Sequence, residues 1–62
     1  MKLREWLFKT RISVKDFSKL LEINRSYLHT IMNGSQIPSA RILYRINEVT
    51  IGQVSKLEDL VD

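Results

Sequence analysis

Residues of the types that cap the start of a helix occur several times along this chain. The intervals between them leave room only for short helices. Ser13, Asn24 and Ser39 each precede a run of apolar residues at helical spacing. Their side-chain oxygens can accept hydrogen bonds from the free amides of a first helical turn. Gly34 follows Asn33 and can adopt the left-handed backbone conformation that closes a helix. The spacing therefore predicts short helices joined by tight links, in an all-α fold.

Five segments have an apolar side at helical spacing, and we expect each to be a helix. They are residues 2–9, 14–23, 24–33, 40–49 and 56–61. Ser55 and Glu58 have the form of a capping box at the start of the last one. The second ends near Glu22 and Ile23, and Asn24 is the cap of the third, so the link between them is only about three residues long, as in a helix-turn-helix. A chain of 62 residues can bury only a small core, so we expect one domain that a second subunit would stabilise.

The composition argues against several classes of function. There is no cysteine, which excludes disulfides and thiolate metal sites. His29 is the only histidine and has no acidic pair at metal-ligand spacing, so we expect no metal site. No catalytic triad motif or glycine-rich phosphate loop is present, so we expect no enzyme and no cofactor. The longest apolar runs are too short for a signal peptide or a membrane span.

Charge is divided unevenly along the chain. Residues 1–45 hold nine Lys and Arg against three acidic residues, a net charge of +6. Residues 46–62 hold one lysine against four acidic residues, a net charge of −3. Such a division can present a positive surface to a polyanion and keep an acidic end away from it.

The outer side of the third predicted helix is polar. Five hydrogen-bonding side chains fall within an arc of about 140° around its axis: Arg25, Ser26, His29, Thr30 and Asn33. The opposite side is apolar, with Tyr27, Leu28 and Ile31. No acidic residue occurs between Ile23 and Asn47. Taken alone, these residues fit either a solvated surface or a helix that reads a DNA major groove.

The segment from Ser13 to Gly34 resembles the helix-turn-helix of the phage repressor and Cro type, also called XRE-like. The resemblance rests on the apolar positions, the small Ser18, the closing Asn33-Gly34 and the following Pro38; the apolar positions are Phe17, Leu20, Ile23, Leu28 and Ile31. It implies a compact, five-helix, lambda-repressor-like domain over residues 1–62, with the helix-turn-helix at 13–33. Glu22 stands where the family most often has a turn glycine, so we expect either a slightly different turn or a small backbone strain at Glu22. Met32 stands where members of this family commonly have a glutamate before the asparagine-glycine pair.

This resemblance implies a small transcriptional regulator, most simply a repressor, that inserts helix 24–33 into the major groove of double-stranded DNA. By resemblance, the base-reading residues are Arg25, Ser26, His29 and Thr30. The residues expected near phosphates are Asn24, Asn33, Ser35, Gln36, Ser39, Arg41 and Lys15. The family also implies a bacterial or phage-encoded, cytoplasmic protein. No small-molecule ligand is evident.

The C-terminal end has more apolar residues than so short a segment can easily bury: Ile51, Val54, Leu57, Leu60 and Val61. They either complete the core against the first helix or form a two-fold interface of a homodimer, at least on DNA. Ile51, Val54, Leu57 and Leu60 are the predicted interface residues. An alternative function uses the same end: a helical protein-interaction module, such as an antitoxin-like or anti-regulator subunit. Binding to protein that is insensitive to salt would favour that alternative.

Overall fold

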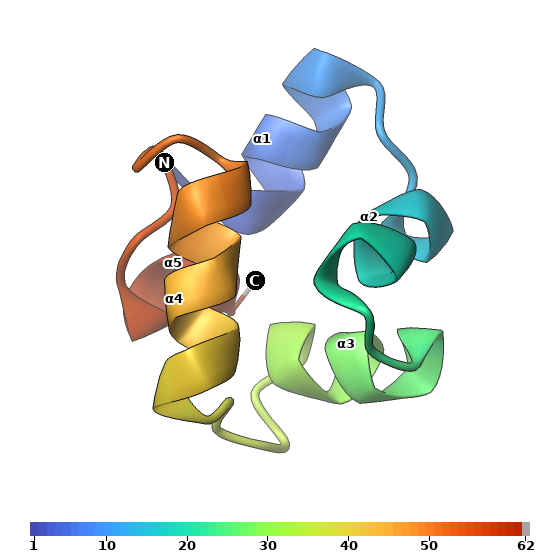
Figure 1. Ribbon diagram of the computed structural model, residues 1–62, viewed down its shortest axis with the longest axis vertical. Helices are drawn as coiled ribbons and strands as arrows, with labels where there is room; N and C mark the ends of the chain where they lie inside the picture. The colour runs from blue at the N-terminus through green and yellow to red at the C-terminus, as the bar shows by residue number, and fades with distance from the viewer. Residues whose placement is uncertain (62) are drawn as a thin grey trace.

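The computed structural model describes residues 1–61 of the chain, which contain five helices and no strand (Figure 1). The helices are α1 (Leu3–Thr10), α2 (Val14–Leu21), α3 (Arg25–Met32), α4 (Ala40–Val49) and α5 (Leu57–Leu60). They pack into a compact unit with a radius of gyration of 10.1 Å. In Figure 1, α1 lies at the top and α3 at the foot, and α4 stands beside them. The predicted all-α class is confirmed.

Side-chain caps begin the three central helices as predicted. The side-chain oxygens of Ser13, Asn24 and Ser39 accept hydrogen bonds from first-turn amides at 3.0, 2.7 and 3.3 Å. Each bond satisfies an amide that has no carbonyl partner within the helix. The starts of α2, α3 and α4 are therefore determined by local sequence.

The predicted capping box of the last helix is wrong. Neither Ser55 nor Glu58 caps α5, whose flanking residue Lys56 makes no side-chain cap hydrogen bond. The end of α5 is instead held by a distant residue. The ammonium group of Lys2 donates to the carbonyl oxygens of Glu58 at 2.7 Å and Val61 at 2.9 Å. A cation beside C-terminal carbonyls is favourable, so a tertiary contact holds the end of α5 although its start has no side-chain cap.

The links after α1 and α2 use left-handed residues that are not glycine. Arg11 has φ 60° and Glu22 has φ 58°. Glu22 lies in the three-residue link between α2 and α3, so of the two alternatives expected there the structure has the non-glycine residue in a left-handed conformation. Its amide donates to the carbonyl oxygen of Lys19 at 3.1 Å, which closes α2. After α3, Gly34 takes the left-handed conformation at φ 85°, as its type predicts.

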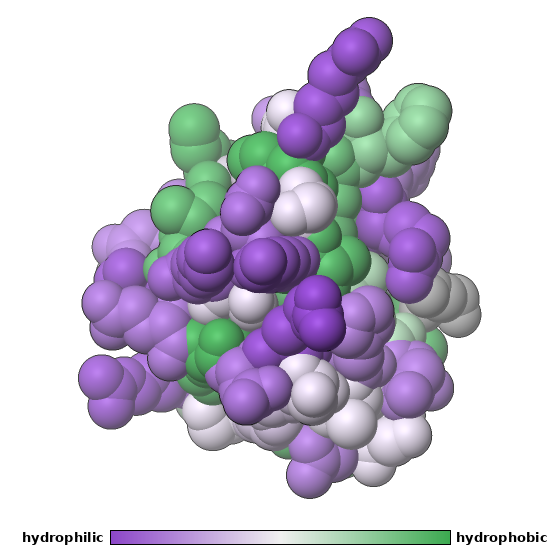
Figure 2. Space-filling model, turned by 90° about the vertical axis from the view of Figure 1, so that its right-hand side faces the viewer, coloured by the Kyte–Doolittle hydropathy of each residue, from purple (hydrophilic) through white to green (hydrophobic). Residues whose placement is uncertain are grey.

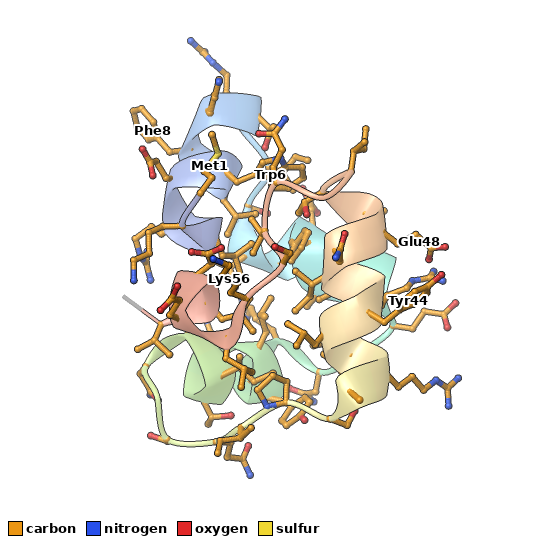
Figure 3. All side chains as sticks on the ribbon, turned by 90° about the vertical axis from the view of Figure 1, so that its left-hand side faces the viewer. Met1, Trp6, Phe8, Tyr44, Glu48 and Lys56 are labelled. Carbon is orange, nitrogen blue, oxygen red and sulfur yellow. The ribbon has the colours of Figure 1, made fainter. Side chains whose placement is uncertain are left out.

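The apolar sides of the helices meet in one core. The buried apolar residues are Leu3, Trp6, Leu7, Phe17, Leu21, Leu28, Ile31, Met32, Ile46, Val54 and Leu60. The rings of Trp6 and Phe17 lie 5.5 Å apart, centre to centre, and join α1 to α2. Met32, at the end of α3, is buried in this core. Phe8 instead points away from the fold (Figure 3).

The segment after α4 folds back onto α1 and completes this core. Thr50 is buried, and its hydroxyl donates to the carbonyl oxygen of Ile46 at 2.8 Å. The Thr50 hydroxyl oxygen also accepts a hydrogen bond from the amide of Val54 at 3.1 Å, and the Val54 side chain is buried. Leu60 is buried on α5, which contacts α1. The expectation that this end completes the core is therefore confirmed for Val54 and Leu60.

The predicted dimer interface needs a correction as a result. Val54 and Leu60 are 0% and 1% exposed within a single chain, so they cannot also face a second copy. Ile51 and Leu57 remain on the surface, with exposed fractions of 87% and 45%. Only these two of the four predicted interface residues are available to a partner.

Candidate nucleic-acid interface

The outer side of α3 is directed away from the core. Arg25, Ser26, His29 and Asn33 are exposed, and Thr30 is half-buried; these five residues are called the α3 face below. Leu28, Ile31 and Met32 on the opposite side are buried. Figure 2 looks at the side of the molecule that carries α2 and α3, and its lower part shows mainly hydrophilic and neutral residues. The predicted division of this helix into a polar and an apolar side is confirmed.

A side-chain cap holds the start of α3. The Asn24 side-chain oxygen accepts the Ser26 amide at 2.7 Å, so that oxygen is already used. The side-chain nitrogen of Asn24 has only donors, which suit a phosphate oxygen. Arg25 is the first residue of the helix and is exposed. Its position beside a positive helix end and its long, rigid guanidinium group suit contacts with bases or phosphates.

The end of α3 and the start of α4 approach each other at the foot of the molecule (Figure 1). The Asn33 side-chain oxygen accepts the Ser35 amide at 2.9 Å, which forms a tight turn. Ser39 uses its hydroxyl oxygen to cap α4, and Arg41 is exposed in the first turn of that helix. Five of the residues predicted near phosphates therefore lie along one continuous stretch of chain: Asn33, Ser35, Gln36, Ser39 and Arg41.

Lys15 lies apart from this stretch. It is exposed in the first turn of α2. Figure 1 shows the start of α2 well above α3 and the loop at the foot. Lys15 is therefore not part of the stretch of chain at residues 33–41.

Two cations near the α3 face have no carboxylate of the described residues within ion-pair distance. Within residues 1–61, Arg25 and Arg41 form no ion pair. Arg45 differs, because its guanidinium group lies 3.9 Å from Glu48 and donates to the Leu20 carbonyl oxygen at 3.4 Å. Arg45 thus joins α4 to α2, whereas Arg25 and Arg41 are available to a polyanion.

Thr30 and Gln36 are linked across the end of α3. The Thr30 hydroxyl oxygen lies 2.7 Å from the Gln36 side-chain oxygen and 2.6 Å from the Tyr27 carbonyl oxygen. The sequence predicted a base contact for Thr30 and a phosphate contact for Gln36, with no connection between them. A pair six residues apart across a helix end has no periodic signal, so only the folded loop reveals it.

Sequence reasoning also missed Ile37. Pro38 is buried, and Ile37 beside it is 80% exposed in the loop after α3. An exposed apolar side chain next to polar groups can contact a thymine methyl group. The only sign of its exposure in the sequence was that Ile37 lies outside the helical spacing of the apolar residues on either side.

Comparisons of the chain with protein-family models, with curated proteins and with solved structures found no match. The geometry of the α3 face and its surroundings therefore carries the functional argument. Across residues 1–61, no helix has the length and apolar character needed to cross a membrane. In the same part of the chain, no three His, Asp or Glu side chains gather at a distance suited to a metal ion.

Proposed function

We propose that this chain is a sequence-specific DNA-binding domain, in which α2 and α3 form a helix-turn-helix of the phage repressor and Cro type. The observation that carries the proposal is the exposed α3 face, which is polar, has no acidic residue and is held on a buried apolar side. A helix with its side chains is about 10–12 Å across, and the major groove is about 12 Å wide. The α3 face can therefore enter the groove.

The surroundings of α3 support this docking. Short, capped links position α3 against α2, and the loop at residues 33–39 leads directly to the exposed Arg41. Amides and cations beside a recognition helix can grip phosphates and set the register of the helix in the groove. The basic character of residues 1–45 adds a salt-dependent attraction. Occupying a promoter in this way would exclude polymerase, so a small repressor is the simplest role.

A two-fold arrangement would place two α3 helices about 34 Å apart, one turn of DNA. The surface residues that can serve such a homodimer are Ile51 and Leu57. Ile51 is a β-branched residue with φ 55°, and its side chain is almost fully exposed. Its amide donates to the Glu48 carbonyl oxygen at 3.2 Å, so the left-handed conformation closes α4. The exposed side chain of Ile51 is the group that a partner would cover.

The same two residues support the second candidate, a protein-interaction module that works through its C-terminal end. Burial of Val54 and Leu60 reduces the apolar surface available for that role. The DNA-binding proposal explains more of the surface, because it uses the α3 face, the loop and the free cations together.

The test is fluorescence anisotropy of the purified chain with a pool of randomised duplexes at two salt concentrations, followed by sequencing of the bound fraction. The proposal expects an enriched site, with affinity that falls steeply as salt rises. Two inverted half-sites one turn apart would establish the dimer. No binding even at low salt, or a bound fraction with no enriched sequence, would refute sequence-specific recognition and favour a search for a protein partner.

A further inference from the structure

The Thr30 hydroxyl lies between two oxygen atoms but has only one proton to donate. It cannot donate to the Tyr27 carbonyl and to the Gln36 side-chain oxygen at once. Turning the Gln36 amide by 180° resolves this, because the oxygen and nitrogen of an amide are almost indistinguishable in shape. The Gln36 nitrogen then donates to the Thr30 oxygen, and Thr30 donates to Tyr27. Both contacts are satisfied in that orientation.

Thr30 is poorly suited to read a base in this arrangement. It is half-buried, and its single proton is used inside the protein. Gln36 is exposed, and its amide retains both kinds of group that a base edge needs. One N–H and the oxygen lone pairs remain free when the other N–H is bonded to Thr30. The group offered to a ligand at this point of the α3 face is therefore the Gln36 amide.

Adenine is the base whose major-groove edge matches such an amide. It presents N7 as an acceptor and the N6 amino group as a donor, and glutamine pairs with both at once. We propose that Gln36, held in place by Thr30, reads an adenine, and that Thr30 is a positioning residue without a base contact of its own. This inference rests on the proposed DNA-binding function and changes the roles that the sequence predicted for both residues.

Fixing Gln36 before binding matters because a free glutamine side chain has many rotamers. Ordering one such side chain costs about 0.5–1.5 kcal/mol at an interface, which corresponds to about a two- to tenfold loss of affinity. A side chain already held in the free protein avoids most of that loss. Thr30 should therefore raise the preference for adenine without touching it.

The first experiment needs no DNA. We would record ¹⁵N relaxation of the Gln36 side-chain amide in the chain itself and in Thr30→Val and Thr30→Ser. Valine keeps the branched shape and removes the hydroxyl, whereas serine keeps the hydroxyl. We expect a restricted amide in the original chain and in Thr30→Ser, and a mobile one in Thr30→Val. Equal mobility in all three would overturn the positioning role, whatever the chain binds.

The second experiment measures binding to the enriched duplex and to each of its single-base-pair variants. Gln36→Ala should abolish the preference for one A·T pair, about five- to a hundredfold, and leave other preferences intact. Thr30→Val should reduce the same preference two- to tenfold, and Thr30→Ser should retain it. In the Gln36→Ala background, Thr30→Val should have no further effect. Circular dichroism of each variant would check that the fold is retained.

The outcomes separate this inference from the proposed function. Failure of the unaltered chain to bind any duplex would refute both. Binding with a uniform loss across all sequences in Gln36→Ala would make Gln36 a phosphate contact and overturn the reading role alone. An effect of Thr30→Val that persists without Gln36 would show that Thr30 touches the base itself.

Discussion

The loop at residues 33–39 and the segment at residues 50–61, whose only regular structure is the one-turn helix α5, each follow a helix, yet they are held in opposite ways. The first is held at the surface by polar side chains, through the Asn33–Ser35 and Thr30–Gln36 contacts. The second is held from within, by a buried threonine hydroxyl and two buried apolar side chains. The comparison teaches that hydrogen bonds at the surface leave side chains available to a partner, whereas buried contacts commit theirs to stability.

The largest expected effect is in the buried segment. Leu60→Ala should lower the free energy of unfolding by about 2–5 kcal/mol, because it leaves a cavity in a small core. Urea denaturation followed by circular dichroism would measure this. Leu57→Ala, three residues earlier on the same helix, is the control and should cost under about 1 kcal/mol. Equal losses would mean that α5 does not pack as described.

A change on the α3 face should affect binding and leave stability almost unchanged. Arg25→Ala should weaken DNA binding by about 1–3 kcal/mol and relax the preference at one base pair. Arg41→Ala is the matched control, because a lost phosphate contact weakens all sequences alike and makes the salt dependence shallower. Anisotropy titrations on single-base-pair variants would measure both. Full affinity and an unaltered preferred site in Arg25→Ala would contradict its role.

Removing one hydroxyl from each region tests the comparison directly. Thr50→Val should lower the free energy of unfolding by about 1–3 kcal/mol, because it leaves the buried Val54 amide without an acceptor. Thr30→Val should cost about 0.5 kcal/mol or less, since water can replace its exposed contact with Gln36. Thermal and urea denaturation of the pair would decide. Similar costs would remove the distinction between the two regions.

The smallest expected effect is a gain. Ile51→Gly should raise the free energy of unfolding by about 0.5 kcal/mol, because glycine relieves the left-handed strain but adds entropy to the unfolded chain. Glu22→Gly should gain less, because glutamate is not β-branched. If Ile51 serves a two-fold contact, the same substitution should weaken binding to paired half-sites and spare a single half-site. A loss of stability would show that Ile51 packs against its own chain.

Much of the fold was predictable because it depends on residues close together in sequence. The caps at Ser13, Asn24 and Ser39 and the closing Gly34 are local signals, and each acts where it was expected. The prediction failed at α5, where the Ser55–Glu58 pattern is present but does not act as a cap. In a helix of one turn, tertiary contacts outweigh a local preference.

The residues of the candidate site also divide into those that the sequence could place and one that it could not. Helical periodicity was enough to place Arg25, Ser26 and His29 on an exposed side, because residues on one helix keep their angular relation whatever surrounds them. Periodicity could not assign Gln36, which lies in a loop and meets Thr30 only after the chain turns.

The sequence by itself determined the number and order of helices and the polar side of α3, since caps and periodicity act over a few residues. The tertiary structure decided which apolar residues of the C-terminal end are buried, how Lys2 holds α5, and which side chain the loop offers beside Thr30. These depend on contacts between segments far apart in the chain or across a turn. These contacts therefore stabilise the protein only when the whole core has formed.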